Sequence, residues 1–158
     1  MWKKINDAEE YLLVGSMAFN VLLVFFQVVM RYVFHNSLSW SEELARYIFL
    51  WQTWLGASYA VRQRRHLRVE MVADRFRGRN RVRFELFVLV VWFAFSLFLA
   101  YQGSRMTLFL VRTGQLSAAM RIPISWAYAS VPVGCAMMAL RLVGEVRLVL
   151  RRLEEEAV

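Results

Sequence analysis

The chain has 158 residues, enough for one ordinary soluble domain, but its composition argues against one. Hydrophobic residues make up 59% of it, above the roughly 45–50% typical of soluble domains, and the mean hydropathy is +0.39. The net charge of +8 raises the question of a nucleic-acid partner, and the single cysteine, Cys135, excludes an intrachain disulfide.

The apolar residues gather in four stretches of the length that a membrane span requires. A bilayer core about 30 Å thick needs about 20 apolar residues of helix, and every backbone amide in it must be satisfied within the segment. A soluble helical bundle is the alternative, but its helices would carry a polar face, and residues 21–26 and 87–93 show none. We therefore predict one all-α integral membrane domain over residues 1–158, with four transmembrane helices at Leu12–Phe34, Leu44–Val61, Phe84–Tyr101 and Ile124–Leu142.

The basic residues predict the orientation of these spans. Nine arginines fall between positions 62 and 83, opposed only by Glu70 and Asp74. Loops rich in arginine and lysine stay cytoplasmic, so this connection and both termini are predicted to lie inside a bacterial inner membrane. The excess charge then serves topology and attraction to phospholipid headgroups, and nucleic acid is not an expected partner. Further basic residues flank the chain ends at Lys3, Lys4, Arg147, Arg151 and Arg152.

The first connection leads into the second span through a charged and aromatic segment. Trp40 stands where an aromatic residue anchors a helix among headgroups, and Glu42 and Glu43 can each pair with Arg46 on one helical face. One interpretation is an ion-paired helix start at the outer interface. The other is a docking surface, which makes these four residues candidates for contact with another subunit or a binding protein.

Small and polar residues in the second and fourth spans predict close helix packing. Gly56 and Ala60 form one small-xxx-small pair, and Ser130 and Gly134 form another. Gln52 can hydrogen-bond between helices. These five residues are candidates for helix packing within the chain or against a partner.

The arginine-rich connection carries its own pattern. Val69, Val72 and Phe76 recur at helical spacing among charged residues, which predicts a short amphipathic helix in the inner interface. Candidates for headgroup or cytoplasmic contacts in this connection are Arg64, Arg65, His66 and Arg68.

Two features shape the remaining spans. No strong helix breaker follows Phe84 until Gly103, and apolar residues then continue, so the third helix is predicted to reach Thr113. At 1.5 Å per residue it would be about 45 Å long and must tilt or protrude. Pro132 lies inside the fourth span and should kink it, freeing the carbonyl of Tyr128.

The sequence carries no pattern typical of catalysis. It has no glycine-rich phosphate loop, and the predicted topology places His35 and His66 on opposite membrane faces, where they cannot bind one metal or haem. The middles of the spans hold no acidic residue of the kind that coupled transporters keep there. We expect a helper subunit without cofactor or metal; a small autonomous exporter or a membrane anchor of another complex are the alternatives.

The Trp-Ser-Glu-Glu block at 40–43 is followed by Gly-Ala at 56–57 and His66. Together with several longer stretches, this specific pattern resembles one known family, the DctQ-like small membrane subunit of tripartite ATP-independent periplasmic (TRAP) transporters. Glu70 departs mildly, because the family often has aspartate there. The resemblance covers nearly the whole chain, at Gln27–Phe34, Leu38–Arg46, Trp54–Arg62, His66–Glu70 and Ile122–Tyr128.

The resemblance implies a three-component system. In that family a soluble periplasmic protein captures an organic anion, such as a C4-dicarboxylate or sialic acid. A large membrane subunit carries the substrate and ion sites and moves as an elevator. The small subunit braces the large one and is expected to help dock the binding protein, during uptake usually driven by Na⁺.

Overall fold

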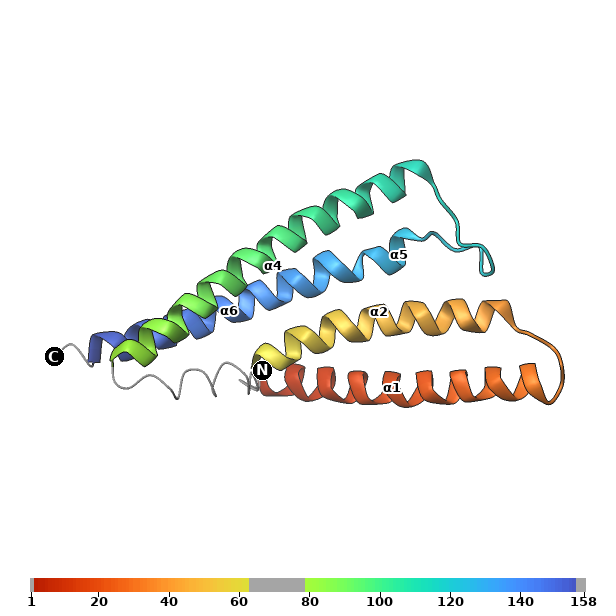
Figure 1. Ribbon diagram of the computed structural model, residues 1–158, viewed down its shortest axis with the longest axis horizontal. Helices are drawn as coiled ribbons and strands as arrows, with labels where there is room; N and C mark the ends of the chain where they lie inside the picture. Colours follow the sequence, from red (N-terminus) through yellow and green to blue (C-terminus); the bar gives the residue numbers. More distant parts are fainter. Residues whose placement is uncertain (1, 63–78, 156–158) are drawn as a thin grey trace.

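The computed structural model describes residues 2–62 and 79–155, and this part of the chain is almost entirely helical (Figure 1). The predicted amphipathic helix at residues 66–76 lies outside the described residues. The helices are α1 (Trp2–Tyr32), α2 (Ser39–Arg62), α4 (Arg79–Thr113), α5 (Ser125–Tyr128) and α6 (Ser130–Glu155).

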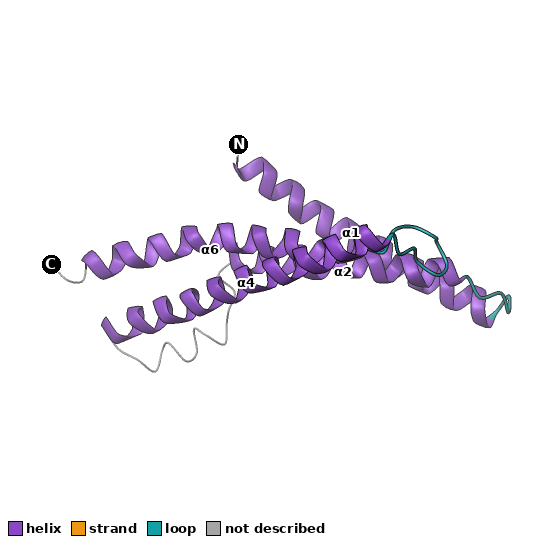
Figure 2. Ribbon diagram, turned by 90° about the horizontal axis from the view of Figure 1, so that it is seen from above, coloured by secondary structure: helices purple, strands orange, loops and turns teal. Residues whose placement is uncertain are grey.

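The four long helices form an open row rather than a closed bundle. Within the described residues, α1 packs on α2, α2 on α6, and α6 on α4, while α1 and α4 do not touch (Figure 1). Seen from above, the first residues of α1 stand apart from α4 and α6 (Figure 2). Successive helices run in opposite directions, so the connections 33–38 and 114–124 lie at one end of the row (Figure 1). We call this the loop end. The first residues of α1 and the last residues of α6 lie toward the other end.

The middle of the row is built on small side chains of α6. Cys135 is fully buried and Leu142 is 1% exposed, and between them Ala139 continues the same face. Where α6 crosses α2, a Cβ added to Gly134 would lie 2.6 Å from the Cβ of Trp54. Where α6 crosses α4, a Cβ added to Gly103 would lie 2.9 Å from Val131 Cγ1. The helices therefore approach as closely as small residues allow, as is common in membrane bundles.

The two edge helices leave their apolar surfaces uncovered. Glu9–Tyr32 in α1 and Asn80–Thr113 in α4 each contain a window of mean hydropathy 2.2, of which 0% and 6% is buried inside the chain. Large side chains such as Phe25 and Phe98 are mostly exposed. Contiguous apolar surface of this extent marks a membrane or protein interface. By length and composition α1 and α4 can cross a membrane. The crossing of the membrane by α2 and α6, and the orientation of the chain in the membrane, stay predictions.

A residue in the left-handed conformation follows shortly after the end of α1 and directly after the end of α4. The helix of the first span stops at Tyr32, two residues before the predicted limit at Phe34, because His35 adopts φ 51° and the Asn36 amide donates to the Met30 carbonyl at 3.0 Å. The third helix continues to Thr113, as predicted, and Gly114 at φ 62° follows it. With 35 residues, α4 is about 52 Å long.

The fourth predicted span is two helices rather than one. The helical pattern is interrupted at Ala129, three residues before Pro132. Pro132 has no amide hydrogen to donate to the Tyr128 carbonyl, as the sequence predicted. The helical hydrogen bonds resume with the Val133 amide, which donates to the Ala129 carbonyl at 3.2 Å. Beyond the predicted limit at Leu142, α6 continues to Glu155, because no further proline stops it.

Candidate functional site

Glu43 fastens the 114–124 loop to the first turns of α2. Its Oε2 accepts hydrogen bonds from the backbone amides of Ala119, at 2.9 Å, and Met120, at 3.0 Å. Its Oε1 accepts a hydrogen bond from the Tyr47 hydroxyl at 3.3 Å. Both carboxylate oxygens are therefore used inside the chain, and the loop is held over the end of α2.

The 114–124 loop has an internal hairpin-like structure that presents those two amides. The Ser117 amide donates to the Ile122 carbonyl at 2.8 Å, and the Ile124 amide donates to the Gln115 carbonyl at 3.1 Å. Arg121 turns the chain back with φ 54°, a left-handed conformation that is uncommon outside glycine. Successive amides in such a turn form a concave site for an anion, which here is the carboxylate of Glu43.

The surroundings of Glu43 favour its ionised form. Partial burial alone would raise the pKa of this carboxyl, but the Met120 and Ala119 amides and the Tyr47 hydroxyl lower it below its ordinary value of 4.5. The buried Ser117 hydroxyl also lowers the pKa of Glu43. Glu43 lies just outside the predicted span 44–61, and it is charged at neutral pH.

Acidification should therefore release the loop. Because the folded pKa of Glu43 lies below 4.5, the attachment is complete above that pH and is lost as the pH falls through the folded value. We expect the Ala119 and Met120 amides to be protected from hydrogen exchange at pH 6, after correction for intrinsic rates, and to lose this protection below pH 4.5 as the pH falls through the folded pKa. In Glu43→Gln, whose amide oxygen can still accept but does not titrate, the protection should be weaker than in the wild type at pH 6 and should not change as the pH falls; a pH response equal to the wild type would contradict this role.

The neighbouring contact candidates lie on the open side of the same helix end. Arg46 and Glu42 form an ion pair with an N···O distance of 3.6 Å, and their side chains are 68% and 55% exposed. Trp40 is 44% exposed. The predicted pairing of Arg46 thus occurs with Glu42, while Glu43 turns toward the loop. Trp40, Glu42 and Arg46 are accessible to another molecule, whereas the carboxylate of Glu43 is occupied.

The predicted packing residues fall at different places in the row. Gly134 lies against Trp54, and Ser130 is fully buried, with its hydroxyl donating to the Ala127 carbonyl at 2.6 Å. A Cβ added to Gly56 would meet no atom within 4 Å, and Ala60 is half-buried. The Gly56–Ala60 pair therefore presents open space on α2. The headgroup candidates Arg64, Arg65, His66 and Arg68 lie outside the described residues.

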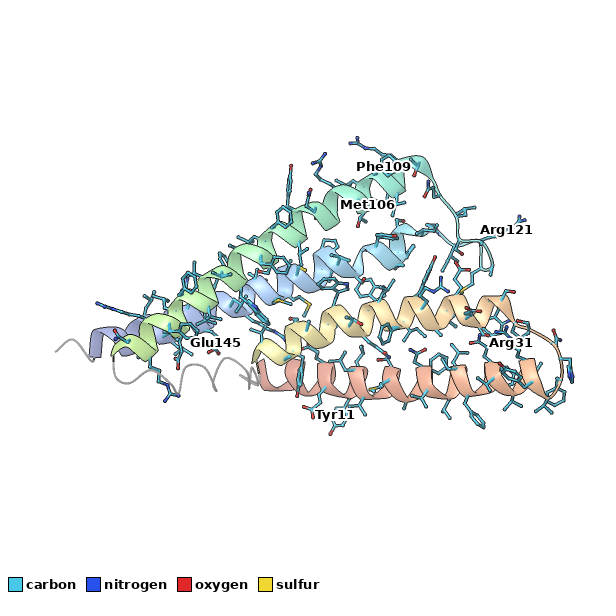
Figure 3. All side chains as sticks on the ribbon, in the orientation of Figure 1. Tyr11, Arg31, Met106, Phe109, Arg121 and Glu145 are labelled. Carbon is cyan, nitrogen blue, oxygen red and sulfur yellow. The ribbon has the colours of Figure 1, made fainter. Side chains whose placement is uncertain are left out.

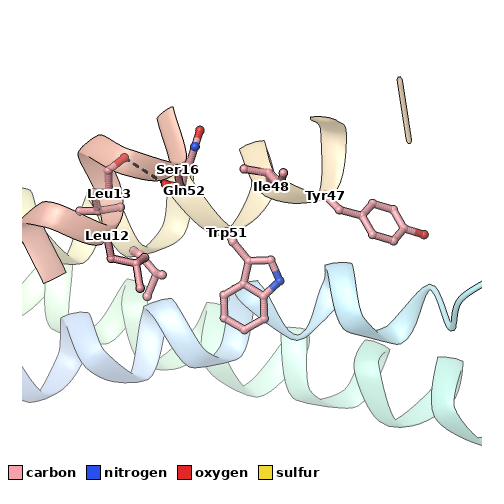
Figure 4. A pocket seen from close by; sticks show the side chains of 8 residues that line it. Leu12, Leu13, Ser16, Tyr47, Ile48, Trp51 and Gln52 are labelled. Atoms are coloured by element: carbon pink, nitrogen blue, oxygen red, sulfur yellow. Dashed lines mark hydrogen bonds between the residues drawn. The ribbon is translucent and has the colours of Figure 1, made fainter. Parts of the chain in front are cut away.

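A shallow apolar groove of about 260 Å³ lies along α1 and α2 (Figure 4). Trp51 points from α2 toward the neighbouring helices, and its indole Nε1 donates to the Trp126 carbonyl at 3.2 Å. The Nε2 atom of Gln52 is buried there without a hydrogen-bond partner in the described chain. The groove is lined by Leu12, Leu13, Ser16, Tyr47, Ile48, Trp51, Gln52 and Leu55.

An ion pair near the other end of the row was missed at the sequence level. Arg141 of α6 pairs with Glu9 of α1, and their side chains are only 20% and 11% exposed. Glu10 accepts a hydrogen bond from the Tyr59 hydroxyl at 2.8 Å. The available signal was Arg141 itself, a charged residue inside the predicted span 124–142, since such residues are costly in lipid and usually paired.

A family model decides what kind of protein carries this arrangement. Residues 20–152 match the family described as "Tripartite ATP-independent periplasmic transporters, DctQ component". The chain belongs to the DctQ family. This family consists of the small permease components of TRAP transporters, so the predicted resemblance is confirmed.

Three curated relatives illustrate the range of the DctQ family. The isethionate TRAP transporter permease protein DctMQ of Oleidesulfovibrio alaskensis is 27% identical over 93% of this chain and 25% of its own length. The sialic acid small permease protein SiaQ of Vibrio cholerae is 28% identical over 88% of this chain and 79% of its own. The C4-dicarboxylate small permease protein DctQ of the same species is 32% identical over 60% of this chain and 40% of its own length. The chain thus spans a quarter of DctMQ and most of SiaQ.

Proposed function

We propose that this chain is the non-catalytic small permease subunit of a TRAP transporter. In this role it braces a large elevator-type subunit in the bacterial inner membrane and helps dock a periplasmic binding protein. Uptake would be driven by an ion gradient, usually of Na⁺. Relatives named for isethionate, sialic acid and C4-dicarboxylates support organic anions as the substrate class.

The uncovered apolar surface of the edge helices is the observation that carries the proposal. A row of four helices buries α6 and one side of α2, but it leaves α1 and α4 with 0% and 6% of their most apolar windows buried. These faces need lipid or protein beside them. A bracing subunit is expected to have such a shape, because its long helices lie flat against a larger neighbour.

The topology proposed for this role places both termini and the arginine-rich connection in the cytoplasm. The loop end, with the 33–38 and 114–124 connections, then faces the periplasm. Arginines near position 62 and after position 79 support this orientation through the positive-inside rule. Docking of a soluble periplasmic protein would occur at the loop end.

Co-purification with the large subunit tests the proposal. The tagged chain is expressed with the large permease subunit of the same organism's TRAP system, extracted in mild detergent and isolated through the tag. We expect a stable complex, and ion-gradient-driven uptake by proteoliposomes only when both subunits and the binding protein are present. An unrelated four-helix membrane protein with the same tag is the control. Uptake by the large subunit alone, at the rate of the complete system, would contradict the bracing role.

A further inference from the structure

We propose that the 114–124 loop, held rigid by Glu43, is the surface that meets an acidic face of the soluble binding protein, and that Glu43 is a positioning residue for it. The inference rests on the proposed function and deepens it. Glu43, a candidate contact with the binding protein in the sequence analysis, is instead proposed to hold the loop that makes this contact.

The geometry of Glu43 excludes it as a free charge for a partner. Its two oxygens accept three hydrogen bonds, two of them from backbone amides 76 and 77 residues away along the chain. Removing those bonds would leave two amides of the loop without an acceptor. A loop fixed before binding loses less conformational entropy when a partner arrives, and this strengthens binding without adding contacts.

The charge at the loop end is positive even when both of its glutamates are counted. Residues 31–48 and 105–128 hold five arginines and two glutamates. Glu42 is paired with Arg46, and Glu43 is occupied by the loop. Arg121, at the turn of the loop, and Arg31 both lie at this end (Figure 3), and Arg112 is exposed on the last turn of α4. An acidic protein surface complements this arrangement and would be steered toward it.

The position of the loop favours a soluble protein over lipid headgroups. Trp126, 66% exposed, and Tyr128, 41% exposed, are aromatic residues of the kind that mark the membrane interface. The loop precedes them in the chain and extends past the beginning of α5 toward the end of the row (Figure 1). Its tip therefore lies on the water side of these aromatic residues. The tip carries the small side chains of Ala118 and Ala119, over which a protein surface can approach closely.

Three variants and two matched controls test the assignment in the full complex of small and large subunits in nanodiscs. Glu43→Ala removes the acceptor, and Glu43→Gln keeps the shape without the charge. Glu42→Gln removes a neighbouring carboxylate that forms an exposed ion pair with Arg46. Arg121→Glu reverses the charge of the tip, with Arg121→Lys as its control. Hydrogen exchange of residues 114–122 and the affinity of the cognate binding protein are measured for each.

We expect Glu43→Ala to speed exchange in the loop and to weaken binding roughly tenfold, with Glu43→Gln between it and the wild type. Glu42→Gln should leave loop exchange unchanged, because its exposed ion pair is with Arg46 of the same helix. Arg121→Glu should weaken binding roughly tenfold while loop exchange stays normal, and the loss should shrink as salt is added.

The outcomes separate this inference from the function on which it rests. Normal loop exchange and normal affinity in Glu43→Ala, or normal affinity in Arg121→Glu, would overturn the inference and leave the bracing role intact. If Arg121→Glu instead changed only the association of the complex with anionic lipid vesicles, a headgroup site would replace the protein contact. A wild-type complex that assembles but binds no binding protein would refute docking altogether.

Discussion

Gly134→Ala should destabilise the chain more than a methyl group added to any other glycine within residues 2–62 and 79–155. The new Cβ would lie 2.6 Å from the Cβ of Trp54 and 2.9 Å from its carbonyl carbon and oxygen. Two of these atoms belong to the backbone of α2, so relief requires the two helices to separate. Overpacking of this kind costs about 1–3 kcal/mol.

Gly56→Ala is the matched control for this prediction. It adds the same methyl group to a glycine in an α-helix, but apart from the backbone of its own helix turn and its chain neighbours no atom of the described residues lies within 4 Å of the new Cβ. Alanine favours a helix over glycine by roughly 0.5–1 kcal/mol, so stability should stay level or rise. The check is the thermal midpoint of the detergent-solubilised chain, expected to fall by roughly 2–8 °C for Gly134→Ala alone. Equal midpoints for the two variants would show that α2 and α6 do not meet at Gly134.

Breaking the Glu9–Arg141 pair from one side should have the second large effect. The two side chains are 11% and 20% exposed, and the pair joins α1 to α6, which the helix packing itself does not connect. Removing one partner leaves the other charge largely buried, which costs about 3–5 kcal/mol in a fully buried site. We expect about 2–3 kcal/mol here, because both groups retain some exposure.

A double-mutant cycle measures this effect. Glu9→Gln and Arg141→Gln should each lower the stability of the chain in detergent, and the double variant should be less destabilised than the sum of the two. The Glu42–Arg46 pair, with side chains 55% and 68% exposed, is the control, and its cycle should give less than about 1 kcal/mol. Additive losses at Glu9 and Arg141 would mean that the pair does not tie α1 to α6.

Local sequence patterns predicted most of the helices because hydropathy and helix breakers act over short distances. The apolar stretches marked where α1, α2, α4 and α6 lie. The absence of a breaker predicted the length of α4, and Pro132 predicted the interruption at Ala129. The end of α1 was missed by two residues because a left-handed conformation at His35 is not evident from its side chain.

The candidate site was only partly predictable because its decisive contacts join residues far apart in the chain. The spacing along the helix allows both Glu42 and Glu43 to pair with Arg46. The neighbouring sequence does not show that Glu43 instead accepts hydrogen bonds from the amides of Ala119 and Met120. A small-xxx-small pair shows that another helix can pack closely there, but it does not show which neighbour fills the space. Gly134 meets Trp54, whereas Gly56 faces open space that a partner or lipid can fill.

Labelling of single cysteines in intact cells tests the central claim, a membrane subunit with its loop end outside, most directly. The native Cys135 is fully buried and should give no background. Ala118→Cys at the loop end should react with a membrane-impermeant maleimide added to spheroplasts, and Arg151→Cys near the other end should react only after lysis. The reverse pattern, or a chain that stays in solution without detergent and labels equally at both positions, would contradict the account.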